Sequence, residues 1–172
     1  QLNALNNAAF DQIEKHFVEI AADDDVVGVV LSGFGIKAFV SGADVPFLAK
    51  IESPAMGEAT SRGSQKSIQA IEDCRKPVVC ALNGLAFGGG NEIAMACNAR
   101  IARANQRILV GQPEVNLGII PGAGGTQRLP RWVGVEKAAE LMRTGRPVSS
   151  AEALAIGLIQ QEVVGDPRAL RQ

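Results

Sequence analysis

Along this chain, short apolar runs are followed by glycine-rich segments and then by helical patterns, and this repeat is the feature that most restricts its fold. Residues 26–31 form a nearly continuous β-branched run, which is typical of a strand buried on both faces. A second buried strand is expected at 78–82, and a third unit carries expected short strands at 101–104 and 108–110. Strands that alternate with helices predict an α/β layered fold.

Apolar residues at helical spacing predict the helices between these strands. Phe10, Ile13, Phe17 and Ile20 recur between polar residues and indicate an amphipathic helix. Further helices are expected at 58–73, 92–97, 135–143 and 150–157, and a Gly/Pro loop at 118–125. The chain has 172 residues, 47% of them hydrophobic, and no linker or low-complexity segment divides it, so we expect a single domain over 1–172.

The charge balance and the cysteines exclude several classes of protein. Seventeen Lys plus Arg against eighteen Asp plus Glu leave a net charge of −1, which argues against nucleic acid as a partner. No apolar run reaches the roughly 20 residues that a membrane span needs, so we expect a soluble protein. Cys74, Cys80 and Cys97 lack paired C-x-x-C spacing, which favours reduced thiols, a reducing compartment and no metal site. The single histidine, His16, lies on an expected surface helix and is a poor candidate for a catalytic base.

Two glycine-rich segments are candidates for ligand binding. Gly33, Gly35 and Ala38 formally match a dinucleotide-binding fingerprint, but the chain continues irregularly toward Pro46 where that fingerprint requires a helix. Residues 88–90 are three adjacent glycines between a buried strand and a helix. They indicate either tight packing of the helix on the strand or backbone amides directed at a negative oxygen of a ligand. Taken alone, this segment leaves both interpretations open.

A third candidate is Glu114, which follows Gln112-Pro113 and precedes an apolar, glycine-rich loop. An isolated glutamate is usually an ordinary surface residue. The loop nevertheless carries Leu117, Ile119 and Ile120, which are plausible walls of an apolar pocket and equally plausible core residues.

Together these motifs resemble the crotonase (enoyl-CoA hydratase/isomerase) superfamily. The similarity rests on residues 37–45 (KAFVSGADV), on the triple glycine that leads to Glu92, and on Gln112-Pro113-Glu114 followed by residues 121–129 (PGAGGTQRL). It extends from the LNALN segment near the N-terminus to residues 155–158. The resemblance implies a crotonase-like spiral of repeated ββα units, in which the upstream strands and the C-terminal trimerisation helices of the family are absent from this chain.

The resemblance also implies a set of site residues. It assigns the two amides of an oxyanion hole to Ala43 and Gly89, and the acid/base pair to Glu92 and Glu114. Side chains and backbone of the first motif would bind the coenzyme A part of the substrate. Those residues are Ala38, Ser41, Asp44 and Val45. No metal and no separate cofactor are expected, because coenzyme A belongs to the substrate.

Two glutamates at these positions favour an enoyl-CoA hydratase, which converts a trans-2-enoyl-CoA to a 3-hydroxyacyl-CoA and serves fatty acid metabolism by β-oxidation. The same scaffold also supports isomerases, hydrolases and decarboxylases of acyl-CoA. Alternatives of another class are a non-catalytic subunit that binds CoA esters and an RNA-binding relative, the latter disfavoured by the net charge.

By resemblance we expect a homotrimer or hexamer of the full-length protein, located in the cytoplasm or the mitochondrial matrix. In some relatives this unit is fused to a 3-hydroxyacyl-CoA dehydrogenase, and the sequence leaves open whether that applies here. Acyl chain length also stays open, since residues 46–62, which would bound the acyl tail, carry no motif.

Overall fold

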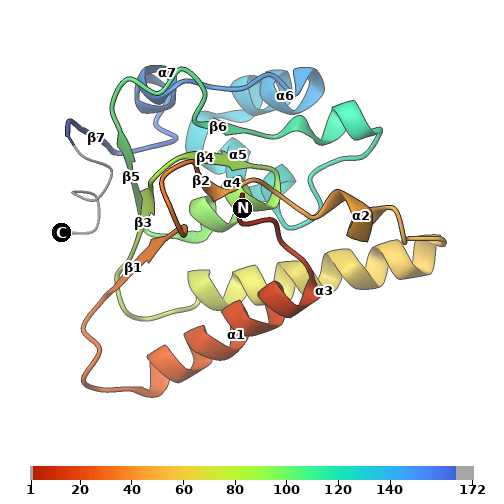
Figure 1. The fold of residues 1–172 in the computed structure, drawn as a ribbon, viewed down its shortest axis with the longest axis horizontal. Coiled ribbons are helices and arrows are strands. Elements are labelled where there is room, and N and C mark those ends of the chain that lie inside the picture. The colour runs from red at the N-terminus through yellow and green to blue at the C-terminus, as the bar shows by residue number, and fades with distance from the viewer. Residues whose placement is uncertain (1, 166–172) are drawn as a thin grey trace.

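Two parallel sheets, with helices packed around them, make up the computed structural model, which describes residues 2–165 (Figure 1). The strands are β1 (Val29–Ser32), β2 (Ala38–Val40), β3 (Val78–Leu82), β4 (Leu85–Phe87), β5 (Ala99–Arg103), β6 (Val110–Gly111) and β7 (Gln161–Val163). The helices are α1 (Asn7–Ala22), α2 (Val45–Leu48), α3 (Pro54–Glu72), α4 (Gly89–Ala96), α5 (Gly125–Val133), α6 (Val135–Thr144) and α7 (Ser150–Ala155), and the 3-10 helix is η1 (Pro113–Leu117).

Consecutive strands alternate between the two sheets. The first sheet has the order β1-β3-β5-β7, the second has the order β2-β4-β6, and every pairing within them is parallel. Each unit therefore gives one strand to each sheet and then continues into helical structure, which confirms the expected spiral of ββα units. Parallel strands require such crossover connections, because a tight turn can join only antiparallel neighbours.

Two expectations about the first unit were wrong. The run 26–31 forms a strand only from Val29, and it is not buried on both faces, since Val27 is 88% exposed and Val30 is 58% exposed. Side chains alternate between the two faces of a strand, and Val29 and Leu31 pack against the core, so Val30 lies on the opposite face. The stretch after Ala38 was expected to be irregular, but its first two residues, Phe39 and Val40, belong to β2. The segment 33–38 thus leads into a strand, which agrees with rejecting the dinucleotide fingerprint.

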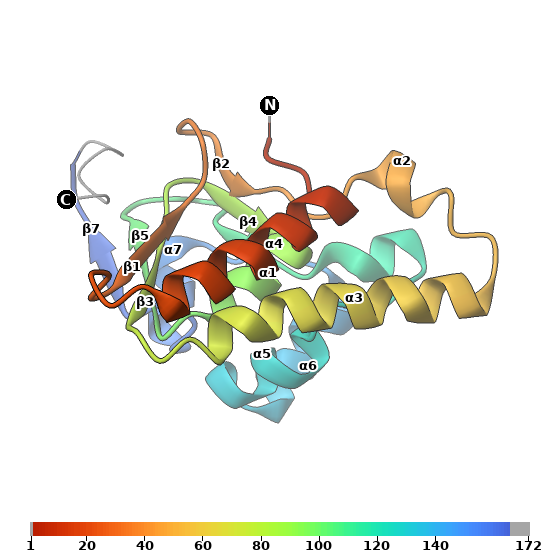
Figure 2. The ribbon, with the colours of Figure 1, turned by 90° about the horizontal axis from the view of Figure 1, so that it is seen from below.

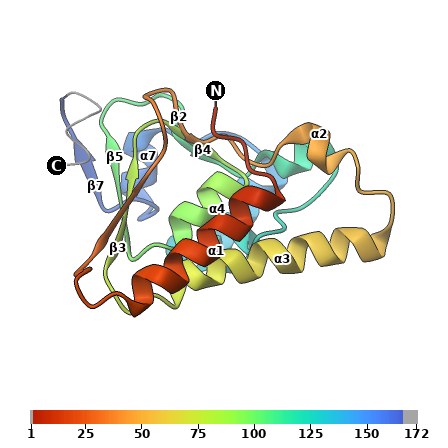
Figure 3. The ribbon, with the colours of Figure 1, turned by 60° about the horizontal axis from the view of Figure 1, so that its bottom comes forward.

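Helices α1 and α3 lie side by side along one flank of the molecule (Figures 2 and 3). Phe10 and Phe17 of α1 are buried and belong to the hydrophobic core, together with Ile68 and Ile71 of α3. Helix α3 begins four residues before the expected start because the hydroxyl of Ser53 accepts a hydrogen bond from the third helical amide and Pro54 occupies the first turn. The other expected helices differ from the observed bounds by a few residues at their ends, and α2, η1 and α5 were not expected.

In all three views α2 and the N-terminal half of α3 project on the side of the molecule opposite β7 (Figures 1 to 3). Helix α4 runs through the centre, and nearly all of its residues are buried. Within residues 2–165, none of the helices combines the length and the apolar character that crossing a membrane requires. The projecting elements form one wall of the cavity described next.

Candidate active site

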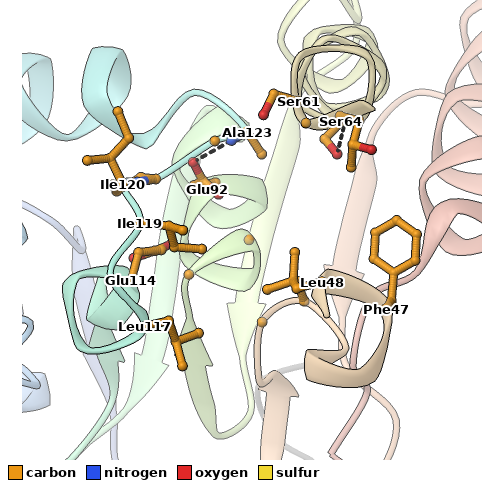
Figure 4. Close-up of a pocket in the computed structure, with 18 of the residues that line it drawn as sticks. Phe47, Leu48, Ser61, Ser64, Glu92, Glu114, Leu117, Ile119, Ile120 and Ala123 are labelled. Carbon is orange, nitrogen blue, oxygen red and sulfur yellow. Dashed lines mark hydrogen bonds between the residues drawn. The ribbon is translucent and has the colours of Figure 1, made fainter. Parts of the chain in front are cut away.

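A cavity of about 990 Å³ lies between the projecting α2 and α3 on one side and the start of α4, η1 and the loop before α5 on the other (Figure 4). Six of the eight site residues expected from the sequence line it: Ser41, Ala43, Val45, Gly89, Glu92 and Glu114. Leu117, Ile119 and Ile120 also line it, so they are walls of this pocket and not core residues. The fold thus brings three sequence motifs, far apart in the chain, to one cavity.

Glu92 is held in a fixed orientation by the loop before α5. Its side chain is 2% exposed, and Oε1 accepts hydrogen bonds from the backbone amides of Ala123 (2.9 Å) and Gly125 (2.7 Å). Burial raises the pKa of Glu92 above its ordinary value, while these two amides and the positive charge of Arg128 oppose the rise. With Oε1 occupied in this way, Oε2 is the oxygen left to act on a ligand.

Glu114 makes fewer hydrogen bonds than Glu92. It lies on η1 and is 9% exposed, and among the residues described its Oε2 is buried without a hydrogen-bond partner. Burial raises the pKa of Glu114 to about 7, a backbone hydrogen bond opposes this, and the negative charge of Glu92 adds to it. Near neutral pH both protonation states are populated, as a group that gives and takes protons requires.

Each of the three adjacent glycines has its own structural reason. Gly88 has a φ of +50°, and a Cβ there would lie 2.9 Å from Oε1 of Glu114. A Cβ on Gly90 would lie 2.1 Å from the carbonyl oxygen of Val40, so this glycine allows α4 to pack on β2. Gly89 lines the cavity and is the first residue of α4, where a backbone N–H has no acceptor within the helix. Tight packing and a free amide thus both occur, at different glycines.

The backbone amide of Ala43 is left free by the pairing of its neighbours. Leu5 donates to the carbonyl of Gly42 (2.8 Å) and accepts from the amide of Asp44 (2.8 Å), which forms an isolated parallel bridge. Along an extended chain, successive N–H groups point to opposite sides, so the amide of Ala43 points away from Leu5. Within residues 2–165 neither this amide nor that of Gly89 has a hydrogen-bond partner, and both residues line the cavity.

Two residues expected to bind the substrate do not line the cavity. Ala38 is 1% exposed in β2, and its carbonyl accepts hydrogen bonds from the side-chain amides of Asn3 and Asn83. Asp44 occupies the N-cap position of α2 without a side-chain capping hydrogen bond, outside the cavity lining. Ala38 and Asp44 are therefore not part of the cavity lining, although Asp44 is next to Ala43 and Val45 in the chain.

Arg128 supports the site and was not singled out from the sequence. It is 6% exposed, forms an ion pair with Glu72 (2.7 Å) and donates to the carbonyl of Ala123 (3.2 Å). These contacts connect α3 to the loop whose backbone amides bind the carboxyl group of Glu92. Its place in the TQRL segment is the available signal, but nothing in that pattern shows that the arginine is buried.

No group of three or more His, Cys, Asp or Glu side chains gathers between residues 2 and 165. The cavity is lined by the carboxyl groups of Glu92 and Glu114 and by the two free backbone amides. Such a set can stabilise a developing oxyanion and move a proton at a neighbouring carbon.

Comparison with known proteins agrees with this geometry. The family model for enoyl-CoA hydratase/isomerase matches residues 1–169. The chain is 44% identical over 162 residues to the short-chain-enoyl-CoA hydratase of Clostridium acetobutylicum, which covers 94% of this chain and 61% of that relative. It is 36% identical to the fatty acid oxidation complex subunit alpha of Idiomarina loihiensis, over 94% of this chain and 23% of that relative.

The crystal structure of enoyl-CoA hydratase from Bacillus anthracis is similar with a TM-score of 0.89 and 37% identity, over 99% of this chain and 64% of that one. The chain spans 61% of the length of the Clostridium relative, so it corresponds to part of such a protein. A match over nearly the whole chain, together with the shared fold and the two-glutamate cavity, shows that the chain belongs to the enoyl-CoA hydratase/isomerase family.

Proposed function

We propose that this protein adds water across the double bond of a trans-2-enoyl-CoA to give a 3-hydroxyacyl-CoA. The observation that carries the proposal is the meeting of Glu92 and Glu114, both buried and both with a raised pKa, in one cavity with the free amides of Ala43 and Gly89. Relatives named as hydratases support it further. One carboxyl group would suffice to move a proton between carbons, so the second favours hydration.

In the proposed reaction the amides of Ala43 and Gly89 hold the thioester oxygen as it gains negative charge. One such donor is typically worth about 10²- to 10³-fold in rate. Glu92, fixed through Oε1, orients the water with Oε2. The hydroxyl of the water adds to the β-carbon, Glu114 gives its proton to the α-carbon on the same face, and the remaining proton of the water restores Glu114.

The test follows the loss of enoyl-thioester absorbance with crotonyl-CoA for the wild type, Glu114→Gln and Glu92→Gln. Acid/base catalysis of this kind contributes about 10²- to 10⁴-fold to the rate, so the hydration rate of each variant should fall by at least about 10²-fold. Glu136→Gln, an exposed glutamate on α6, is the matched control and should keep the wild-type rate. An unchanged rate in Glu114→Gln would refute the assignment.

Product analysis separates hydration from the other reactions of the family. Mass spectrometry of the product should show the mass of the enoyl-CoA plus one water. An unchanged mass with a shifted double bond would identify an isomerase, and release of free coenzyme A would identify a hydrolase. Loss of carbon dioxide from a carboxylated substrate would identify a decarboxylase, and no product at all would favour a non-catalytic subunit.

We further propose that the protein serves fatty acid oxidation as a homotrimer or hexamer that requires no cofactor or metal. The relative named as a fatty acid oxidation complex subunit alpha supports this role. This chain covers 23% of that relative, and we include fusion to a 3-hydroxyacyl-CoA dehydrogenase in the proposal. The buried free thiols of Cys74, Cys80 and Cys97 suit a reducing compartment, either a bacterial cytoplasm or a mitochondrial matrix. Light scattering after gel filtration tests the assembly, and activity after treatment with EDTA tests metal independence.

A further inference from the structure

One end of the cavity is bounded by polar side chains of α3 that face the loop before α5. Thr60, Ser61, Ser64 and Gln65 lie within about one and a half turns of this helix, and all four line the cavity. Figure 4 shows Ser61 and Ser64 on α3 facing Ala123, whose amide is bonded to Glu92. The opposite end, near Phe47, Leu48 and Leu117, is apolar.

A hydrogen bond joins the two walls at this polar end. The side-chain amide of Gln65 donates to the carbonyl of Gly122 over 2.8 Å, although the two residues are 57 positions apart. Gln65 is exposed, so the bond lies where the cavity meets solvent. The walls also approach closely here, because a Cβ on Gly122 would lie 3.1 Å from Oγ of Ser61. We call this hydrogen bond, from Gln65 to Gly122, the latch.

The position of the catalytic groups places the acyl chain at this end. If the thioester oxygen binds to the amides of Ala43 and Gly89, the double bond lies beside Glu92 and Glu114. Glu92 is bonded to the amide of Ala123, next to Gly122, so the carbons beyond the double bond extend toward the latch. A long aliphatic chain would have to pass between Ser61 and Gly122 and break the latch in order to reach solvent.

The polar wall adds a second restriction. The hydroxyl of Ser64 donates to the carbonyl of Thr60 (3.0 Å), whereas the hydroxyl of Ser61 has no hydrogen-bond partner among residues 2–165. Covering such a hydroxyl with methylene groups carries a desolvation cost that a short chain, ending before it, avoids. Both restrictions act on the same part of the substrate.

We propose that Gln65 is a specificity-determining residue, whose hydrogen bond to Gly122 closes the acyl end of the cavity and restricts the enzyme to short-chain acyl-CoA thioesters. This inference rests on the proposed function only for the direction in which the thioester binds. Gln65 touches no reacting atom, so its loss changes which chains bind without removing the catalytic groups.

The test measures the dissociation constants of butyryl-CoA and octanoyl-CoA by titration calorimetry. Both thioesters are saturated, so neither can be hydrated. The wild type should bind butyryl-CoA more tightly. Gln65→Ala, and Gln65→Glu, which keeps the size of the side chain but cannot donate to a carbonyl, should improve octanoyl-CoA binding about tenfold relative to butyryl-CoA, the lower range for one methylene in a pocket. Gln12→Ala, an exposed glutamine on α1, should leave the ratio unchanged.

The inference is overturned if the ratio is unchanged in both Gln65 variants, or if the wild type prefers octanoyl-CoA. Thermal melting of each variant identifies any that does not fold, and Gln65→Glu carries the test if Gln65→Ala fails to fold. Hydration of crotonyl-CoA by the wild type is measured alongside. Absence of hydration with the expected change in binding ratio would refute the proposed function alone, and hydration with an unchanged ratio would refute the role of Gln65 alone.

Discussion

The backbone amide of Gly125 donates a 2.7 Å hydrogen bond to Oε1 of Glu92, so the first residue of α5 sets the orientation of a carboxyl group on α4. No side chain is tolerated at this position. A Cβ on Gly125 would lie 2.9 Å from the same carboxylate oxygen and 2.5 Å from Nε2 of Gln112. The glycine is thus required by the close approach of two buried polar groups.

Gly125→Ala should therefore displace Glu92 and reduce kcat for crotonyl-CoA by about 10²-fold, the loss typical of misplacing a catalytic group by roughly 1 Å. Steady-state kinetics and the affinity for butyryl-CoA separate the effects, since affinity should change much less than kcat. Gly63→Ala is the matched control, because Gly63 is exposed on α3 with no atom near its missing Cβ. Wild-type kcat in Gly125→Ala would contradict the role of this contact.

The pH dependence of the reaction should report the carboxyl group of Glu114. With a pKa of about 7, this group is protonated below neutrality and ionised above it, and only the protonated form can donate to the α-carbon. We expect kcat/KM to be level below pH of about 7 and to fall about tenfold per pH unit above it. Stopped-flow rates at constant ionic strength measure this profile.

Binding of butyryl-CoA over the same pH range is the control for that profile, because it shows whether substrate affinity and not proton transfer causes the fall. A profile that stays level well above neutrality would mean that Glu114 does not act as the proton donor in its protonated form.

The family pattern predicted by position in the chain that Glu92, Glu114, Ala43 and Gly89 belong to one site, and the structure brings all four to one cavity. The amphipathic spacing likewise predicted α1. Both signals are local or follow chain order, and neither depends on knowing which surfaces meet. The pocket-wall role of Ile120 could be guessed from composition, but its distinction from a core residue required the structure.

Most of the features that sequence reasoning missed depend on contacts between distant segments or on very short elements, and the exception is the nine-residue helix α5. Helix α2 has four residues and β4 has three, too few for any period to appear. Val30 is exposed because only the face of β1 that carries Val29 and Leu31 packs against the core, which a run of β-branched residues does not reveal. Gln65 becomes important only because the fold brings it to Gly122.

Replacing two helical glycines with alanine should change the free energy of unfolding in opposite directions. Gly90→Ala places a Cβ 2.1 Å from the carbonyl of Val40 and should lower the free energy of unfolding by about 1–3 kcal/mol, as overpacking typically does. Gly63→Ala meets no atom and should raise it by about 0.5–1 kcal/mol, because glycine loses more backbone entropy on folding. Urea denaturation followed by circular dichroism measures both, and shifts of the same sign would contradict this assignment.

The buried carboxyl group of Glu114 should lower the stability of the folded protein at neutral and higher pH. Its pKa is about 7 in the folded protein against an ordinary value of 4.5, so between these values the folded state binds more protons than the unfolded state. The free energy of unfolding therefore falls as pH rises from 4.5 to about 7. Above about pH 7 the loss caused by this carboxyl group is complete. A difference of this size corresponds to a penalty of about 3 kcal/mol.

Glu114→Gln removes the ionisable group, so the variant should be more stable than the wild type at pH of about 8 and close to it at pH of about 4.5, where the wild-type carboxyl is protonated in the folded state and about half protonated in the unfolded state. Urea denaturation at the two pH values measures the difference, and Glu136→Gln on the exposed face of α6 controls for the loss of one negative charge. An equal change at both pH values would show that burial does not hold this carboxyl group in its protonated form. A gain confined to the higher pH, in a variant that has lost hydration of crotonyl-CoA, would show that the same unpaired carboxyl group carries both the catalytic role and the cost in stability.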